Sequence, residues 1–142
     1  MSDDLAAANV NRAYQLASSS IAIFTFLLLF LYPRFASGDV SPLPFHAALI
    51  VMGVATFCFA FASFFYYAAS LGARIEEAER ARYSYRADRI WLIGYVLLFL
   101  APSLALFTVR LFPAALVWFG LWLFYVIFVV RNFSRVRTIR KS

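Results

Sequence analysis

The stretch IWLIGYVLLFLAPSLALFTV at residues 90–109 contains no Asp, Glu, Lys or Arg over 20 residues. Three further stretches share this property, at residues 14–32, 46–70 and 114–130, and hold 19, 25 and 17 residues. A hydrocarbon core about 30 Å thick requires roughly 20 apolar residues of helix to cross it. The sequence therefore predicts an all-α fold, in which residues 1–142 form a single membrane domain with four transmembrane helices packed as a bundle.

The composition agrees with this class. The chain is 64% hydrophobic and 20% aromatic, with a mean hydropathy of +0.79. These values exceed the apolar share of about half that is typical of soluble domains.

The basic residues predict the orientation. Only Arg34 and Arg110 lie on one side of the four predicted spans, in the loop 33–45 and in the short turn before residue 114. The other side carries 11 basic residues, which are Arg12, Arg74, Arg80, Arg82, Arg86, Arg89, Arg131, Arg135, Arg137, Arg140 and Lys141. The positive-inside rule therefore predicts that both termini, the loop 71–89 and the tail 131–142 are cytoplasmic.

The net charge of +6 is interpreted as a belt beside the anionic leaflet of a lipid bilayer and not as a nucleic-acid surface. Arg outnumbers Lys by 12 to 1, which is typical of a GC-rich genome and favours a bacterial inner membrane. The alternative that residues 21–32 belong to a cleaved signal peptide is opposed by Asp3 and Asp4 in the leading segment.

The segment 72–89 alternates Glu and Arg, with Glu76 four residues before Arg80 and Glu79 three residues before Arg82. Such pairs support a solvent-exposed helix. We expect the second helix to continue past the membrane surface and to turn near residues 83–85. A docking surface for a cytoplasmic partner is the functional alternative to a solvated helix end.

Small residues predict the faces by which the helices pack, because membrane helices associate through close backbone approach. A stripe of small or hydroxylated residues at the spacing 3,4,3,4,3 is expected to face the bundle interior on the second helix, and similar stripes are expected on the third and the first. The predicted packing residues are Gly53, Thr56, Ala60, Ser63, Tyr67 and Ser70, then Gly94, Leu98, Ala101, Ala105 and Thr108, and finally Ser18, Ala22 and Thr25.

The fourth predicted helix is bulky on all sides, and Gly120 is its only small residue between 117 and 125. Such a helix faces lipid or another apolar subunit. In the third helix, Pro102 removes one backbone hydrogen bond and predicts a possible kink. The neighbouring Ser103 is expected to help satisfy the backbone groups that the proline frees.

No chemistry-bearing cluster stands out in the sequence. His46, Cys58 and Asp39 do not converge in any pattern that suits nucleophilic catalysis or a metal. Phosphate-binding glycine loops are also missing. We therefore expect no cofactor, no metal and no enzymatic activity.

The predicted plan of four spans with cytoplasmic termini is similar to that of Orai calcium channels. Residues 98–101 and 111–113 also resemble their third span. Those channels carry an acidic selectivity residue on the first helix, whereas residues 14–32 contain no carboxylate. The resemblance therefore implies a shared plan of spans and not calcium conduction.

Two functional hypotheses follow. The first is a non-catalytic accessory or assembly subunit of a membrane complex, which packs with other membrane proteins or with its own copies. The second is a homo-oligomeric pore or small transporter lined by the hydroxyl groups of Ser18, Ser19, Ser20 and Thr25. The partners expected are the lipid bilayer and other membrane subunits, without nucleic acid.

Overall fold

Four α-helices make up the part of the chain that the structure describes. The computed structural model describes residues 3–71 and 76–139, with side chains for residues 7–71 and 76–131. The helices are α1 (Asp3–Ala36), α2 (Pro42–Ser70), α3 (Glu77–Thr108) and α4 (Phe112–Ile139). Each contains a segment long and apolar enough to cross a membrane. The prediction of four spanning helices in an all-helical chain is thus confirmed at the level of length and composition.

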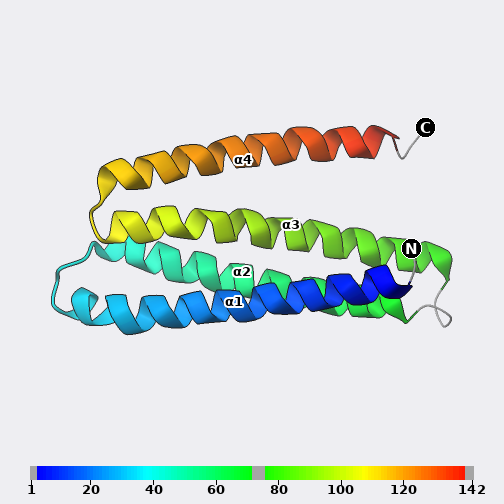
Figure 1. The fold of residues 1–142 in the computed structure, drawn as a ribbon, viewed down its shortest axis with the longest axis horizontal. Coiled ribbons are helices and arrows are strands. Elements are labelled where there is room, and N and C mark those ends of the chain that lie inside the picture. Colours follow the sequence, from blue (N-terminus) through cyan, green and yellow to red (C-terminus); the bar gives the residue numbers. More distant parts are fainter. Residues whose placement is uncertain (1–2, 72–75, 140–142) are drawn as a thin grey trace.

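The helices run antiparallel to their neighbours in chain order (Figure 1). The start of α1, the end of α2, the start of α3 and the end of α4 lie at one end, which we call the terminal end. The opposite loop end holds the short connections 37–41 and 109–111. The main contacts of α1 are with α2, those of α2 also with α3, and α4 packs on α3. The described helices thus form an open array, in which α4 lies at the edge.

Two small clusters of buried side chains join α1, α2 and α3. Near the terminal end, Ala13 of α1 packs with Ala62 and Tyr66 of α2 and with Ala87 of α3. Nearer the loop end, the second cluster consists of Leu27, Met52 and Ala101. Every one of these seven side chains is at most 6% exposed.

The buried residues recur every seven positions along each of these three helices. On α2 two such series interleave, one of large side chains and one of alanines. The buried sets are Ala13, Ser20 and Leu27 on α1; Met52, Phe59 and Tyr66 with Ala55, Ala62 and Ala69 on α2; and Ala87, Gly94, Ala101 and Thr108 on α3. A seven-residue repeat keeps one face of a helix toward its neighbour, as in coiled coils. On α2, large buried side chains therefore alternate with alanines. The small buried residues of α3 allow the two helices to approach closely.

Gly94 lies at a close approach between α2 and α3. A Cβ atom at this position would lie 3.0 Å from Cε1 of Phe59 and 3.1 Å from the Cβ of Cys58. The second of these atoms is fixed to the backbone of α2, so it has little freedom to move. A side chain at this position would require α2 to shift by a few tenths of an ångström, so glycine suits the close contact.

The outer helix α4 is attached to α3 by side chains that reach backbone carbonyls. The indole Nε1 of Trp122 donates a hydrogen bond of 2.8 Å to the carbonyl of Val96. The hydroxyl of the fully buried Ser103 donates one of 3.1 Å to the carbonyl of Ala115. In addition, the ring centroids of Phe99 and Tyr125 lie 5.0 Å apart. These contacts use one side of α4 and leave most of its apolar side chains exposed.

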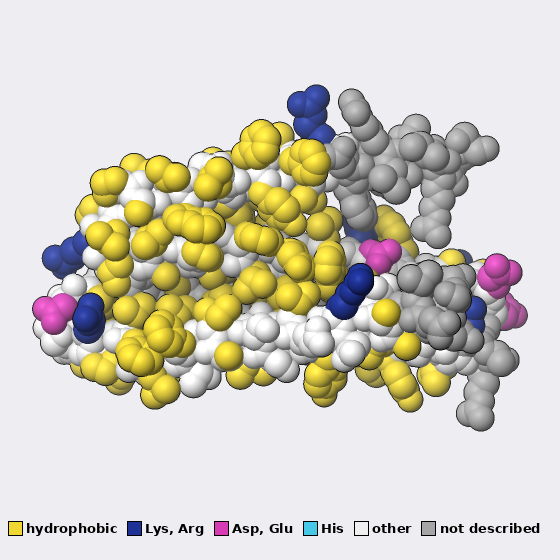
Figure 2. Space-filling model, in the orientation of Figure 1, with side chains coloured by type: hydrophobic (Ala, Val, Ile, Leu, Met, Phe, Trp, Pro, Cys, Tyr) yellow, Lys and Arg dark blue, Asp and Glu magenta, His cyan; other side chains and the backbone are white. Residues whose placement is uncertain are grey.

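Charged side chains gather toward the two ends, and hydrophobic side chains cover the middle of the molecule (Figure 2). The helices hold 28 to 34 residues, which corresponds to about 42 to 51 Å of helix. They are thus longer than the hydrocarbon core of about 30 Å. The apolar middle is a belt, and the helices extend beyond it at one or both ends.

The helices differ from the predicted boundaries at both ends of the belt. Since α1 continues through Pro33 to Ala36 and α2 begins at Pro42, the predicted loop 33–45 is reduced to residues 37–41. Proline is tolerated at the start of a helix, where its missing N–H has no helical partner. In the last turn of α1, Pro33 affects only the end of the helix.

The prediction that the second helix continues through the Glu/Arg segment was wrong. That helix ends at Ser70, and α3 begins at Glu77, so the residues from Glu77 to Arg89 are the first turns of the third helix. Glu77 and Glu79 lie in the first turn of α3, where carboxylates interact favourably with the helix dipole. The predicted turn at residues 83–85 is helical. Within the predicted loop, residues 72–75 lie outside the described part of the chain.

Replacing Gly94 with leucine should destabilise the fold, because the new side chain would enter the contact with Phe59 and Cys58. Overpacked sites typically lose about 1 to 3 kcal/mol. The matched control is Gly120→Leu on α4, where a Cβ would meet nothing within 4 Å. Thermal unfolding in detergent should show a lower midpoint for Gly94→Leu than for Gly120→Leu. Equal midpoints would contradict the close approach of α2 and α3.

Candidate functional site: a polar pocket and a small-residue groove

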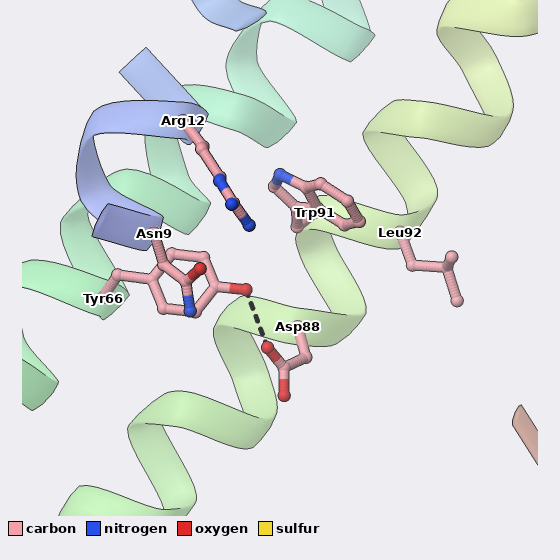
Figure 3. Close-up of a pocket in the computed structure, with 6 residues that line it drawn as sticks. All are labelled: Asn9, Arg12, Tyr66, Asp88, Trp91 and Leu92. Carbon is pink, nitrogen blue, oxygen red and sulfur yellow. Dashed lines mark hydrogen bonds between the residues drawn. The ribbon is translucent and has the colours of Figure 1, made fainter. Parts of the chain in front are cut away.

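A pocket of about 370 Å³ lies among the first three helices and is lined by polar and aromatic side chains. Asn9 and Arg12 come from α1, Tyr66 comes from α2, and Asp88, Trp91 and Leu92 come from α3 (Figure 3). We call this set the polar pocket. Its residues lie near the start of α1, near the end of α2 and in the first half of α3, which places the pocket toward the terminal end.

One hydrogen bond organises the polar pocket. The hydroxyl of Tyr66 donates to Oδ1 of Asp88 over 2.7 Å and joins α2 to α3. Tyr66 is only 4% exposed, whereas Asp88 is exposed. A buried hydroxyl requires a partner, and a hydrogen bond to a charged acceptor is among the stronger ones. The bond therefore satisfies Tyr66 and fixes one carboxylate oxygen of Asp88.

Arg12 brings a cationic group to the same pocket. Figure 3 shows its guanidinium pointing into the space beside Tyr66 and Trp91, with no hydrogen bond to the other five residues drawn. The amide of Asn9 lies on the same helix, three positions earlier. The polar pocket thus presents a guanidinium, an amide and a carboxylate around aromatic rings.

A second hollow lies between α1 and α2 and has a volume of about 470 Å³. We call it the small-residue groove, because Ala17 and Ser18 of α1 face Thr56, Ala60 and Ser63 of α2 across it. Larger side chains complete the lining, namely Val10, Tyr14, Ile21, Phe64 and Tyr67. Among the described residues, no other helix is recorded as lining this groove.

The groove explains an error in the predicted packing face of the second helix. The stripe from Gly53 to Ser70 follows the same 3,4 spacing as the buried series from Met52 to Ala69, but one residue later. One residue turns the direction of a side chain by about 100° around a helix. Ala60 and Tyr67 are therefore exposed, and a Cβ on Gly53 would meet nothing within 4 Å. Four members of the stripe, Thr56, Ala60, Ser63 and Tyr67, line the groove between α1 and α2, and Ser63 is buried there as predicted.

The face predicted on the third helix is the one that packs. Gly94, Ala101 and Thr108 are buried, and Leu98 and Ala105 pack against the cluster of Leu27, Met52 and Ala101. Ala101, Pro102 and Ala105 also line an apolar pocket of about 330 Å³, which Trp118 of α4 completes on one side.

The predicted face on the first helix does not pack. Ser18, Ala22 and Thr25 are exposed, because α1 presents Ala13, Ser20 and Leu27 to its neighbours. The predicted pore-lining hydroxyls also divide between environments. Ser18, Ser19 and Thr25 are exposed, whereas Ser20 is fully buried and its Oγ has no hydrogen-bond partner among the described residues. These four residues do not line one common surface of the chain.

Pro102 lies within a continuous helix from Glu77 to Thr108 and is exposed. The expectation that Ser103 satisfies the groups freed by the proline was wrong. Its hydroxyl bonds across to Ala115 of α4, because Ser103 is buried between the two helices.

His46, Asp39 and Cys58 each have separate local surroundings. Nδ1 of His46 donates to the carbonyl of Pro42 over 2.8 Å, and Asp39 accepts a hydrogen bond from Ser37. Cys58 lies opposite Gly94, between α2 and α3. Among the side chains described, those of residues 7–71 and 76–131, no three His, Cys, Asp or Glu residues are grouped so that they could hold a metal ion.

The sequence interpretation missed the polar pocket because it treated Arg12 and Asp88 only as residues that flank spans. Each lies two positions before a charge-free stretch, at residues 14–32 and 90–109, and Tyr66 lies near the end of residues 46–70. In antiparallel helices these three positions share one end of the belt. The sequence therefore indicated the polar pocket through the position of these residues relative to the apolar stretches, and not through their spacing along the chain.

Comparison with known proteins adds no functional information. No protein-family model, no curated protein and no solved structure matches this chain.

Replacing Tyr66 with phenylalanine should lower the free energy of unfolding by about 1 kcal/mol, because the hydrogen bond to Asp88 is lost while the ring is kept. Tyr67→Phe is the matched control, since Tyr67 is 56% exposed. Chemical unfolding of both variants in detergent measures the difference. If the two variants are equally stable, the bond between Tyr66 and Asp88 does not contribute to the fold.

Proposed function

We propose that this protein is a non-catalytic integral membrane subunit that takes part in the assembly of a larger membrane complex. In this proposal it resides in a bacterial inner membrane with both termini in the cytoplasm. The observation that carries the proposal is the small-residue groove between α1 and α2.

The groove supports lateral association because of where its small residues lie. Ala60 and Ser18 are exposed at the apolar belt, and no helix of the described chain covers them. Lipid tails are as apolar as leucine, so membrane helices associate where small residues allow close backbone approach. The sites at Gly94 and Ala101 show that this chain uses such residues for its own contacts. The groove offers the same chemistry to a helix from another subunit.

The outer helix α4 supports the same proposal. Its contacts with α3 use one side, and Leu116, Leu121, Phe124 and Phe128 are each more than half exposed. This surface suits lipid or a second apolar subunit. Two uncovered apolar faces fit a role in assembly better than a role as an isolated monomer.

The distribution of basic residues supports the proposed orientation. Arg12, Arg80 and Arg131 belong to helix segments at the terminal end, whereas Arg34 and Arg110 lie at the loop end. The terminal end therefore carries the excess of positive charge that marks the cytoplasmic side.

Purification of the tagged full chain from its native membranes in mild detergent tests the assembly role. A heterologous membrane protein should be recovered in fixed stoichiometry with the unaltered chain. Ala60→Leu should reduce this recovery about tenfold or more, because the leucine would fill the groove. Ala114→Leu on α4 is the matched control, since Ala114 is also exposed but lies outside the groove.

Two results would overturn the assembly role. One is an equal recovery of the partner with Ala60→Leu and with Ala114→Leu. The other is a symmetric oligomer of this chain alone that conducts ions or solutes in liposomes, which would favour a pore.

A further inference from the structure

The polar pocket lies at the boundary between the charged terminal end and the apolar belt. Arg12 and Asp88 lie two positions before the charge-free stretches of α1 and α3, and Trp91 and Leu92 lie at the start of the apolar part of α3. Tryptophan and tyrosine are typical of this depth, where lipid headgroups meet the hydrocarbon core. The pocket therefore opens at the level of the headgroups when the belt spans a bilayer.

The charges of the pocket are suited to a ligand that carries both a negative and a positive group. The guanidinium of Arg12 has five N–H donors in a planar fork, which matches the oxygens of a phosphate. The amide of Asn9 is a further donor on the same helix. On the opposite side, Tyr66 occupies only Oδ1 of Asp88, which leaves Oδ2 as an acceptor for a cationic N–H group. The bond from Tyr66 holds this carboxylate in place.

We propose that the polar pocket binds the phosphoethanolamine headgroup of a membrane phospholipid. Arg12 and Asn9 hold the phosphate, and Asp88 accepts hydrogen bonds from the ammonium group. A headgroup with a phosphate but no amine brings the same negative charge and offers Asp88 no ammonium group to offset it. The pocket should therefore prefer phosphatidylethanolamine to phosphatidylglycerol.

The lipid is favoured over free phosphoethanolamine by what surrounds the pocket. Leu92 forms part of its wall, and Ile93, the next residue along α3, is 53% exposed on the apolar belt. Acyl chains attached to a bound headgroup would continue along this apolar surface, whereas a free headgroup gains nothing from it.

The proposal rests on the membrane insertion that the proposed function assumes, but not on any partner subunit. Its test uses the purified full chain in detergent, so that its failure is distinguishable from a failure to recover a partner from membranes.

Native mass spectrometry with added phosphatidylethanolamine or phosphatidylglycerol measures the preference. The unaltered chain should bind phosphatidylethanolamine about tenfold more tightly, since hydrogen bonds to charged groups are at stake. Asp88→Asn should remove this preference, and Arg12→Gln should weaken the binding of both lipids. The matched controls Asp39→Asn and Arg34→Gln change charges at the loop end and should leave binding unaltered. Equal binding of the two lipids by the unaltered chain would overturn the proposal.

A second comparison separates ligand selection from folding. Asp88→Glu keeps the carboxylate, so it should keep the preference for phosphatidylethanolamine that Asp88→Asn loses. Loss of the preference in both variants would show that the charge does not select the lipid. Free phosphoethanolamine at the same concentration should not displace the bound lipid. If free phosphoethanolamine binds as tightly as the lipid, the ligand is a soluble molecule, and the assignment to a membrane lipid is overturned.

Discussion

The close approach of α2 and α3 at Gly94 and Phe59 is the contact on which the rest of the structure depends. The absence of a side chain at Gly94 lets the ring of Phe59 lie against the backbone of α3. The other helices attach to this pair from opposite sides, α1 mainly on α2 and α4 on α3. Without a hydrophobic force between helices in lipid, such steric fit has to supply the association. The seven-residue series of small side chains on α3 repeats this fit along its length.

The same principle connects the fold with the proposed function. Small residues are covered where α3 meets α2, and they are uncovered in the groove beside Ser18 and Ala60. The uncovered set offers to another subunit the type of contact that the covered set already makes within the chain. At the terminal end, the helices instead bring polar groups together, and a hydrogen bond from Tyr66 to Asp88 joins α2 to α3. The proposed subunit contact and the proposed lipid site thus have separate lining residues.

The sequence predicted the four helices because a charge-free stretch of spanning length has few structural alternatives. It also predicted the packing face of α3, where Gly94 and Ala101 are small within a bulky helix. On α2 the predicted packing face was displaced by one residue from the buried face, because the series that starts at Gly53 and the series that starts at Met52 have the same spacing. Small size favoured the first series, but the buried one alternates Met, Phe and Tyr with alanine. Which of the two series is buried depends on the small residues that α3 presents to α2, and the sequence of α2 alone does not reveal them. The polar pocket was missed for a related reason, because its residues come from three helices.

Both the groove and the polar pocket depend on where the terminal end lies with respect to the membrane. Single cysteines at Ser37 and at Ala81, each in a Cys58→Ala background, report on the two ends directly, because both positions are exposed. A membrane-impermeant maleimide added to intact spheroplasts should label Ser37→Cys, and it should label Ala81→Cys only after lysis. Labelling of Ala81→Cys in intact spheroplasts, or protection of Ser37→Cys, would contradict a cytoplasmic terminal end.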